Sequence, residues 1–560
     1  MSDFNYRRRR SSVVSIGDTP LGGDYPIRIQ SMATVSTMDT DAAVNQAIRM
    51  IKAGAEYVRF TAQGEREAQN LRNIRQALTT QGFTTPLVAD VHFNPNVACK
   101  AALFVEKIRI NPGNFVDKAH NSETIAFSDE SYENDIRKIR ERFIPFLKIC
   151  RENNTAIRIG VNHGSLSGRI MNRYGDTPEG MVTSCMEFLR ICREEHFDRV
   201  VISIKASNTV VMIRTVRLLV RTMDAEDMHY PLHLGVTEAG DGEDGRIKSA
   251  VGIGSLLVDG IGDTIRVSLS EEPEMEMPVA RKLVHYISTL SAHPPINAIA
   301  SPQYNPVNPT RRKSRVVAGI GGDNPPVVIS NLTQYNAEAK FINLTFNDLN
   351  DEKIRFLKTD KHTIAIVSGT HTHYVGEVRA FMHRLLDADC DVPVIFRREY
   401  SDTDIETVQI KAAIDFGTLF TDGFGDGIMM LHKNNAICNT NMLVNCMLSI
   451  LQAARVRISK TEYISCPGCG RTLFDLQKTI AQVKAATSHL IGLKIGIMGC
   501  IVNGPGEMAD ADYGYVGAGR GRINLYKGKT CLLKNIPEED AVEQLLQLIS
   551  KSQTNDAHRF

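Results

Sequence analysis

The sequence lacks an excess of charge and a long apolar run. Its 65 Lys and Arg residues are balanced by 64 Asp and Glu residues, so the formal net charge is +1 at pH 7. A chain without a net field has no overall attraction for nucleic acid or for anionic membranes. No apolar run reaches the ~20 residues that span a bilayer, and no apolar core follows the N-terminal arginines as it would in a secretory signal. We therefore expect no nucleic-acid partner and no membrane partner.

The sequence also lacks the even set of regularly spaced cysteines that marks a disulfide framework. It has 11 cysteines, an odd number, and most of them lie in helix-like stretches. This usage is typical of a reducing compartment, in which buried thiols stay free, so we expect a cytoplasmic protein. The 560 residues are enough for several domains.

What the sequence does have is a group of three cysteines near its C-terminus. The segments ISCPGCGRTLFDLQ and MGCIVNGPGE carry Cys466, Cys469 and Cys500, and Glu507 follows in a Gly-Pro-Gly turn. Glycines around all three cysteines let backbone N–H groups approach the sulfur atoms. Three sulfur ligands and one oxygen ligand are unusual for a closed zinc site, and they suit an iron–sulfur cluster with one differently ligated iron. On spacing alone, zinc remains the main alternative and a redox dithiol a weaker one, while Glu507 is equally a ligand or a solvated loop residue.

The first half of the chain alternates short β-branched runs with longer amphipathic segments. Such alternation indicates parallel strands joined by helices. Eight units of this kind before about residue 290 predict an α/β fold with an N-terminal (β/α)8 TIM barrel. The predicted strands are PIRIQSM at 26–32, AEYVRFT at 55–61, PLVADVH at 86–92, KIRIN at 107–111, TAIRIGV at 155–161, RVVISIK at 199–205, PLHLGVT at 231–237 and DTIRVSL at 263–269.

The carboxyl ends of the predicted strands carry charged and polar residues, and in a barrel this end holds the active site. An unbalanced group of cations there predicts an anionic ligand, and arginine favours phosphate because its planar fork matches phosphate oxygens. The barrel therefore predicts a small, doubly charged, diphosphate-like substrate, with Asn111 and Asn162 orienting it. The strand ends supply five cations that face only two carboxylates: Arg59, Arg109, Arg158, Lys205 and Arg266 against Asp90 and Glu238.

Two strand-end residues are candidates for proton chemistry. Glu238 lies in VTEAGDGEDG at the end of the seventh strand. Neighbouring cations should lower its pKa, which suits a base or a hydrogen-bond acceptor, whereas proton donation would need local desolvation. A purely structural pairing with one arginine is the alternative. His92 is a possible proton donor, but we favour its role as a hydrogen-bonding partner of Asp90.

The middle of the chain is predicted to be an inserted domain. A Pro-, Asn- and Ser-rich linker, SAHPPINAIASPQYNPVNPTRRKS, leads into further alternating strand-like and helical segments. DGIGDTIRVSL at 259–269 has an echo in DGFGDGIMMLH at 422–432, which fits a second, degenerate barrel-like domain. This segment lacks the strand-end arginines and any cysteine pair, so its expected role is structural. We predict three domains: a substrate-binding barrel at 1–291, the α/β insertion at 292–460 and an α+β cluster domain at 461–560.

These motifs together resemble one known family. IQSM, VADVHF, RINPGN, IRIGVNHGSL, IKAS, HLGVTEAG, GIGDTIRVSL, SCPGCGRT and GCIVNGPGE are similar to the 4-hydroxy-3-methylbut-2-enyl diphosphate synthases of the methylerythritol phosphate pathway. The resemblance covers nearly the whole chain, and the insertion matches the larger, three-domain form. One departure is the run of acidic residues in TEAGDGEDG, where other members carry neutral or basic ones.

The resemblance implies a bacterial iron–sulfur oxidoreductase. It implies reductive ring opening and dehydration of 2-C-methyl-D-erythritol 2,4-cyclodiphosphate, with two electrons passing through a [4Fe-4S] cluster held by Cys466, Cys469, Cys500 and Glu507. Ferredoxin or flavodoxin would donate the electrons, and a homodimer is possible. Glu238 and Glu507 would be the catalytic residues. The residues expected to bind substrate are Arg59, Asp90, His92, Arg109, Asn111, Arg158, Asn162, Lys205, Arg266 and Ser268.

A zinc-dependent hydrolase acting on a small phosphorylated substrate is the main functional alternative. It would be colourless, hold one zinc ion and need no reductant. A simple electron carrier would leave the cationic barrel mouth unexplained, and carriers usually bind their cluster through four cysteines.

Overall fold

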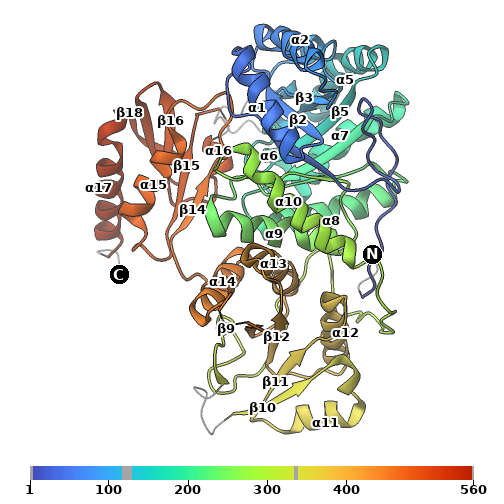
Figure 1. Cartoon of the computed structure of the whole chain (residues 1–560), viewed down its shortest axis with the longest axis vertical. Coiled ribbons are helices and arrows are strands. Elements are labelled where there is room, and N and C mark those ends of the chain that lie inside the picture. The colour runs from blue at the N-terminus through green and yellow to red at the C-terminus, as the bar shows by residue number, and fades with distance from the viewer. Residues whose placement is uncertain (1–3, 117–128, 333–338, 435, 503, 558–560) are drawn as a thin grey trace. The chain divides into compact units, whose positions relative to one another are not determined.

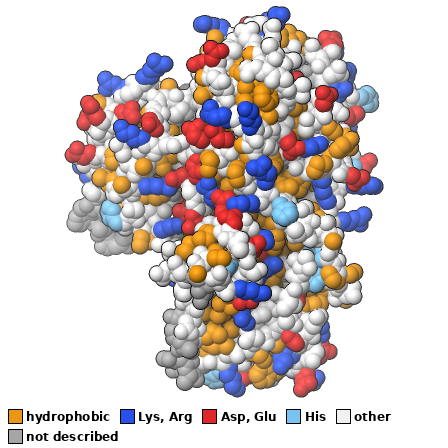
Figure 2. Space-filling model, viewed as in Figure 1, with side chains coloured by type: hydrophobic (Ala, Val, Ile, Leu, Met, Phe, Trp, Pro, Cys, Tyr) orange, Lys and Arg blue, Asp and Glu red, His pale blue; other side chains and the backbone are white. Residues whose placement is uncertain are grey.

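The computed structural model describes residues 4–116, 129–332, 339–434, 436–502 and 504–557. The chain divides into two compact units. The barrel unit comprises Arg10–Gly245, Gly262–Ala280 and Lys460–Phe560, and the insert unit comprises Met1–Arg9, Arg246–Ile261 and Arg281–Ser459. None of the described helices is long and apolar enough to cross a membrane. On the face drawn in Figure 2, basic and acidic side chains are interspersed, in keeping with the near-zero net charge.

The barrel unit contains the predicted (β/α)8 barrel. Its parallel strands follow the order β6-β5-β4-β3-β2-β1-β8-β7. A bridge between Ile202 and Leu232 joins β6 to β7 and closes the ring. The strands are β1 Arg28–Met32, β2 Tyr57–Thr61, β3 Leu87–Asp90, β4 Lys107–Ile110, β5 Ala156–Asn162, β6 Val200–Lys205, β7 His233–Leu234 and β8 Thr264–Ile265.

Helices connect these strands (Figure 1), and polar caps fix where several of them begin. Asp39 accepts the Ala42 N–H before α1, and Asn208 accepts two backbone N–H groups before α8. Helices α9 and α10 each have residues in both units. The helices are α1 Thr40–Ala53, α2 Glu65–Thr80, α3 Pro95–Ala101, α4 Pro112–Phe115, α5 Asp129–Glu152, α6 Gly168–Tyr174, α7 Pro178–Glu194, α8 Thr209–Ala225, α9 Gly242–Val258, η1 Pro273–Met275 and α10 Glu276–Thr289.

The interior of the barrel is apolar where the amino ends of its strands lie and polar further along the strands. A small hairpin bridged at Val14 and Leu21 closes the amino ends of the strands, where it packs against Tyr57 and neighbouring strand residues. Barrel interiors are usually filled by Val, Ile and Leu. Here five buried side chains have polar atoms without a hydrogen-bond partner among the described residues: Gln30, Lys107, Arg158, His233 and Thr264.

The C-terminal residues of the barrel unit form a mixed sheet of order β14-β15-β16-β17-β18, which we call the C-terminal domain. Its first three strands pair in parallel, and its last three form an antiparallel meander. Apolar faces of α15 and α17 pack on this sheet and build its core. The elements are β14 Glu462–Ser465, α15 Leu476–Thr487, β15 Lys494–Met498, α16 Gly504–Glu507, β16 Tyr513–Gly519, β17 Arg522–Lys527, β18 Thr530–Pro537 and α17 Glu538–Ala557. The predicted α+β architecture is confirmed.

The insert unit is built on a five-stranded parallel sheet of order β10-β11-β12-β13-β9. This is the strand order of a barrel that has been opened between β9 and β10. Within this unit, the C-terminal half of α9 packs tightly on α13, since a Cβ on Gly254 would lie 2.5 Å from Ile414. The elements are β9 Val327–Val328, β10 Lys340–Leu344, η3 Phe346–Asp348, α11 Asp351–Thr359, β11 Thr363–Ser368, α12 Tyr374–Asp387, β12 Val394–Tyr400, α13 Ile405–Thr421, β13 Gly427–His432 and α14 Thr440–Ala453.

The two units share one hydrogen-bonding arrangement at the sequence echo. In the barrel unit, Asp263 accepts the Ser11 hydroxyl at 2.8 Å and the Leu232 N–H at 2.9 Å. In the insert unit, Asp426 accepts the Ser314 hydroxyl at 2.7 Å and the backbone N–H of the residue that begins β12 at 2.9 Å. Each aspartate stands just before the last strand of its sheet. The insertion is therefore barrel-like, as the echo predicted.

Candidate active site

A cavity in the barrel unit lies between the carboxyl ends of the barrel strands and the cysteine-bearing loops of the C-terminal domain. Its empty space, which includes volume open to solvent, is about 740 Å³. One chain supplies both sides. The sequence-predicted residues that line the cavity are Arg59, Asp90, Arg109, Arg158, Asn162, Lys205, Glu238, Arg266, Ser268, Cys466, Cys469, Cys500 and Glu507.

Among the residues that the structure describes, three of the predicted cations have no carboxylate bound to them. Arg158 is buried, and its Nε and Nη1 have no hydrogen-bond partner among the described residues. The Nε of Arg59 donates to the Met32 sulfur at 3.0 Å, and burial together with neighbouring arginines lowers the pKa of Arg59 to about 10 despite the opposing effect of Asp90. Burial and Arg59 lower the pKa of Lys205 well below its usual value. An anion entering the cavity would relieve the desolvation of all three groups.

Two other predicted cations are neutralised by carboxylates. Arg109 Nη1 donates to Asp90 at 3.1 Å. Arg266 donates to both carboxylate oxygens of Glu276 at 3.0 and 3.2 Å, and Ser31 donates to the same carboxylate. The expectation that the cations face only Asp90 and Glu238 is therefore wrong. Glu276 was missed because it lies in the acidic run EEPEMEM, where a solvated helix start explains a glutamate equally well.

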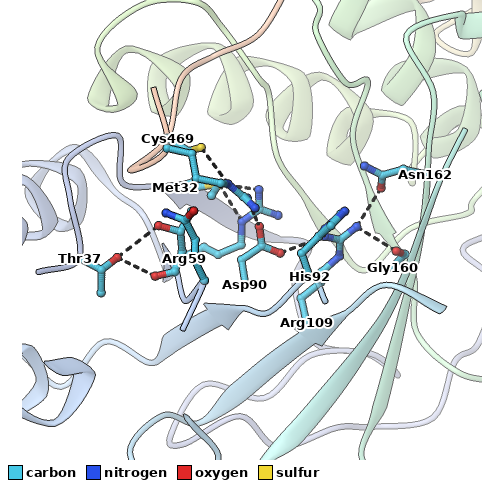
Figure 3. Close-up of polar contacts among 12 residues, drawn as sticks. Met32, Thr37, Arg59, Asp90, His92, Arg109, Gly160, Asn162 and Cys469 are labelled. Atoms are coloured by element: carbon cyan, nitrogen blue, oxygen red, sulfur yellow. Dashed lines mark hydrogen bonds and ion pairs between the residues drawn. The ribbon is translucent and has the colours of Figure 1, made fainter. Parts of the chain in front are cut away.

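Arg109 is the centre of a hydrogen-bonded network on the barrel side (Figure 3). Its Nη2 donates to the Gly160 carbonyl at 2.9 Å and to the Asn162 side-chain oxygen at 3.0 Å. Parallel pairing of β3, β4 and β5 places Asp90, Arg109 and Arg158 in register, which brings these side chains to one level of the barrel. The network leaves Arg109 with fewer free donors than Arg158.

Two contacts tie this barrel network to the C-terminal domain. Arg471 Nη2 donates to Asp90 at 3.3 Å, and Arg471 Nε donates to the Cys469 sulfur at 3.5 Å. On the other side, Asn162 Nδ2 donates to Glu507 at 2.8 Å. Arg471 is a site residue that the sequence interpretation missed, although it directly follows the CPGCG motif.

His92 and Asn111 are buried beside the cavity but do not line it. His92 Nδ1 lies 3.1 Å from Arg109 Nη1, so its partner is Arg109 and not Asp90 as predicted. Burial and the charge of Arg109 lower the pKa of His92 well below its usual value, so its imidazole is neutral. The Asn111 side-chain oxygen accepts the Gly113 N–H at 3.2 Å and caps the short helix α4.

Glu238 lies at the barrel mouth in a left-handed backbone conformation with φ of 49°. Its carboxylate accepts the hydroxyl hydrogen of Thr237 and contacts the Glu507 side chain. Burial raises the pKa of Glu238 well above its usual value, and Glu507 raises it further. The expectation that neighbouring cations would lower this pKa is wrong, because the desolvation and the second carboxylate outweigh Lys205. A protonated Glu238 can donate a hydrogen.

The three cysteines lie on loops that follow two adjacent parallel strands. Cys466 and Cys469 follow β14, and Cys500 follows β15. The Gly499 N–H donates to the Cys466 sulfur at 3.2 Å, and Arg471 donates to the Cys469 sulfur, as thiolates would require. Gly468, in the first loop, has a φ of 80°, which only glycine adopts without strain. Among the described residues, no three His, Cys, Asp or Glu side chains converge on a single-ion site.

Two family models match the chain. The GcpE TIM-barrel domain matches residues 11–281, and the GcpE protein C-terminal domain matches residues 462–551.

Curated relatives match over the full length. The chain is 63% identical to "4-hydroxy-3-methylbut-2-en-1-yl diphosphate synthase (flavodoxin)" of Parabacteroides distasonis, over 99% of each protein. It is 56% identical to the protein of the same name from Phocaeicola vulgatus, over 98% of each. Identity to that of Chlorobaculum tepidum is 39%, over 98% of this chain and 90% of the relative.

Proposed function

Because the chain belongs to the GcpE family of 4-hydroxy-3-methylbut-2-en-1-yl diphosphate synthases, we propose that it opens 2-C-methyl-D-erythritol 2,4-cyclodiphosphate reductively in isoprenoid biosynthesis. The product is 4-hydroxy-3-methylbut-2-enyl diphosphate. The reaction consumes two electrons and two protons and releases one water. The observation that carries the proposal is the shared cavity, in which unpaired barrel cations face three cysteines and a glutamate.

A [4Fe-4S] cluster is the cofactor that we propose for Cys466, Cys469, Cys500 and Glu507. The donor set supports this assignment, because the sulfur atoms of Cys466 and Cys469 already accept N–H groups. The three cysteines and Glu507 would hold the cluster from the two loops that follow β14 and β15. The described side chains do not converge on a single-ion site of the kind that a zinc hydrolase would need. The bound cluster would supply the two electrons one at a time.

The barrel residues bind the substrate and handle its protons. Arg158, Arg59 and Lys205 bind the diphosphate oxygens, which gives these buried cations the bound anion that no described side chain supplies. They also stabilise the negative charge that the diphosphate gains when the ring C–O bond breaks. Arg109 and Arg266 complete the anion site from positions fixed by Asp90 and Glu276.

Asn162 and Ser268 orient the ligand from the adjoining cavity wall. His92 and Asn111 act from behind it, His92 by holding Arg109 and Asn111 by fixing the turn after β4. Glu238 holds a proton at the cavity surface and is the donor that we propose for the departing hydroxyl group.

The donor and the organisation of the chain complete the proposal. The names of the curated relatives specify flavodoxin, which supports flavodoxin rather than ferredoxin as the electron donor. We place the enzyme in the cytoplasm. The three-domain division at 291 and 460 stays a proposal, supported by the family models, which leave residues 282–461 unmatched. A homodimer stays a prediction, and light scattering of the purified protein tests it.

The first experiment is anaerobic purification with iron and sulfide counts, followed by turnover of the cyclic diphosphate with a chemical reductant. A brown protein with about four irons per chain and product formation is the expected result. A colourless protein with one zinc ion that hydrolyses phosphorylated substrates without a reductant would overturn the proposal in favour of the hydrolase.

Replacement of a cysteine ligand should remove the cluster selectively. Cys500→Ser should lose most of its iron and at least about a hundredfold in turnover, while the circular dichroism of the barrel persists. Cys531→Ser is the matched control, because Cys531 belongs to the same domain on β18 and does not line the cavity. Iron content in Cys500→Ser equal to that of the control would contradict the assigned ligand set.

A further inference from the structure

Arg471 contacts both a proposed cluster ligand and the hydrogen-bonded network of the barrel. It follows the CPGCG loop of the C-terminal domain, and its side chain is 5% exposed. One edge of its guanidinium faces the Cys469 sulfur at 3.5 Å, and the other faces the Asp90 carboxylate of the barrel at 3.3 Å. A planar fork can hold both partners at once, which the single ammonium of a lysine cannot do with the same geometry.

The hydrogen bonds continue beyond Arg471 in an unbroken chain across the barrel mouth. Asp90 accepts from Arg109, Arg109 donates to Asn162, and Asn162 donates to Glu507. The chain begins at one proposed cluster ligand, Cys469, and ends at another, Glu507. It crosses between the C-terminal domain and the barrel twice, at the contact of Arg471 with Asp90 and at that of Asn162 with Glu507.

The burial of these groups makes the first crossing energetically significant. The side chains of Asp90 and Arg471 are 4% and 5% exposed, so solvent screens their attraction little. Arg59, Arg109 and Arg471 together overcome the burial penalty and lower the pKa of Asp90 well below its usual value. The contact between the barrel and the C-terminal domain is therefore a fully ionised, buried pair, with a second arginine on the barrel side.

The same guanidinium acts on the sulfur. Hydrogen bonds and positive charge near the sulfur ligands of an iron–sulfur cluster raise its reduction potential. Arg471 supplies both to Cys469. Its orientation is fixed by Asp90, so the electronic effect on the cluster depends on the barrel being docked.

We propose that Arg471 is a positioning residue that docks the barrel onto the C-terminal domain through Asp90 and raises the reduction potential of the cluster through Cys469. This inference rests on the proposed function. It assigns the link between substrate site and electron source to one side chain, so that the cluster accepts electrons most readily when the barrel is in place above it.

The test compares the anaerobically purified, cluster-loaded wild type with Arg471→Met and Arg471→Lys. Arg520→Met is the matched control, because Arg520 is an exposed arginine of the same domain that does not line the cavity. Wild-type iron content and turnover are measured first. Failure at that step overturns the proposed function, whereas a normal wild type isolates the question about Arg471.

The first readout is the midpoint potential of the cluster in a mediated redox titration. Arg471→Met should lower the ratio of reduced to oxidised cluster about tenfold at a fixed potential, which corresponds to 59 mV for a one-electron couple. Arg471→Lys keeps the charge and should recover part of that shift. A potential in Arg471→Met equal to that of Arg520→Met would overturn the inference that Arg471 raises the reduction potential of the cluster.

The second readout is backbone hydrogen exchange, followed by mass spectrometry over residues 466–472 and 88–94. Loss of the docking contact should speed exchange in both segments in Arg471→Met and leave Arg520→Met unchanged. If Arg471→Met fails to retain its cluster, Asp90→Asn provides the same test from the barrel side and should speed exchange in residues 466–472. Unchanged exchange in these variants would overturn the inference that Arg471 docks the barrel onto the C-terminal domain.

Discussion

At the scale of single residues, the barrel mouth contains one arginine that is paired with a carboxylate and one that has no such partner among the described residues. Arg266 is bound by both oxygens of Glu276, and the side chains of this pair are 3% and 1% exposed. Arg158 is equally buried, with Nε and Nη1 unpaired among the described atoms. The same substitution at these two positions should therefore change different properties of the protein.

Arg266→Met should destabilise the fold. It leaves Glu276 as a buried charge without its main partner, which costs about 3–5 kcal/mol of unfolding free energy. Arg158→Met removes an unpaired buried charge and should leave the free energy of unfolding within about 0.5 kcal/mol or raise it. Its kcat/KM for the cyclic diphosphate should fall about 10- to 100-fold, as expected for one lost hydrogen bond to a charged group.

Denaturant unfolding of the cluster-loaded protein and steady-state kinetics check this pair of variants. Equal stability losses in both would contradict the assignment of Arg158 as a side chain that awaits an anion.

Lys107 is a further buried basic residue with which no described carboxylate pairs. Its ammonium lies 4.2 Å from the centre of the Tyr57 ring, and it has no hydrogen-bond partner among the described residues. Burial and Arg158 lower the pKa of Lys107 well below its usual value, so an unsatisfied amine remains. Lys107→Met should raise the free energy of unfolding by about 1–3 kcal/mol, as measured by denaturant titration. The exposed Lys148→Met on α5 should change it by less than about 0.5 kcal/mol. A destabilised Lys107→Met would show that the amine has an undetected partner.

Part of this residue-level arrangement was readable from the sequence. Strand alternation places Lys107, Arg109 and Asn111 of KIRIN on one face, and the cationic mouth followed from the strand ends. The partners were not readable. Asp90 and Arg471 are 381 positions apart, and Asn162 and Glu507 are 345 apart. No local pattern carries such pairings, because they depend on how the C-terminal domain docks on the barrel. The raised pKa of Glu238 was missed for the same reason, since its cause includes Glu507.

At the scale of elements, the sequence located all eight barrel strands but overestimated the last two. The run PLHLGVT forms only β7 His233–Leu234. The chain departs from the ladder at Gly235, where a Cβ would lie 2.8 Å from the Lys205 ammonium and from the Arg266 carbonyl. The site therefore shortens the strand, because the Lys205 side chain occupies the space that regular strand residues would need. A β-propensity pattern contains no information about that competition.

The contact between the loop after β5 and helix α16 is an element-level feature of the site. Gly164 and Gly506 touch through their backbones, so a Cβ on Gly506 would lie 2.6 Å from the Gly164 carbonyl. Gly506→Ala should push α16 and Glu507 away from the barrel. We expect kcat/KM to fall about 10- to 100-fold, the usual cost of misplacing reacting groups by about 1 Å, while iron per chain stays at the wild-type value.

Gly168→Ala at the start of α6 is the control, because a Cβ there meets no described atom within 4 Å. Full activity of Gly506→Ala would mean that the two glycines are not in contact in the working enzyme.

At the scale of the whole molecule, each unit has a buried aspartate that stands just before the last strand of its sheet, Asp263 in the barrel unit and Asp426 in the insert unit. Loss of either should lower the stability of its own unit. Asp426 is 3% exposed and accepts hydrogen bonds from Ser314 and Val394 within the insert unit. Asp426→Ala should lower the free energy of unfolding of that unit by about 2–4 kcal/mol, because two donors to a charged group lose their partner.

Scanning calorimetry and iron analysis of the holoenzyme check this expectation. The transition of the insert unit should move to lower temperature, while the barrel-unit transition and the iron content stay constant. Asp351→Ala, at a side chain that is 87% exposed, should leave both transitions in place. A parallel loss of both transitions would show that the units unfold as one.

The way the chain threads through the two units has a consequence for its synthesis on the ribosome. The insert unit needs residues up to Ser459, and the barrel unit, which begins at Arg10, needs Lys460–Phe560 to cover its mouth. Translation delivers these segments last. The barrel strands therefore emerge long before the segment that covers their cationic mouth. Helices α9 and α10 are also synthesised before the residues of the insert unit against which they pack. The nascent chain spends most of its synthesis time with open surfaces, which makes it a natural client for chaperones that bind growing polypeptides.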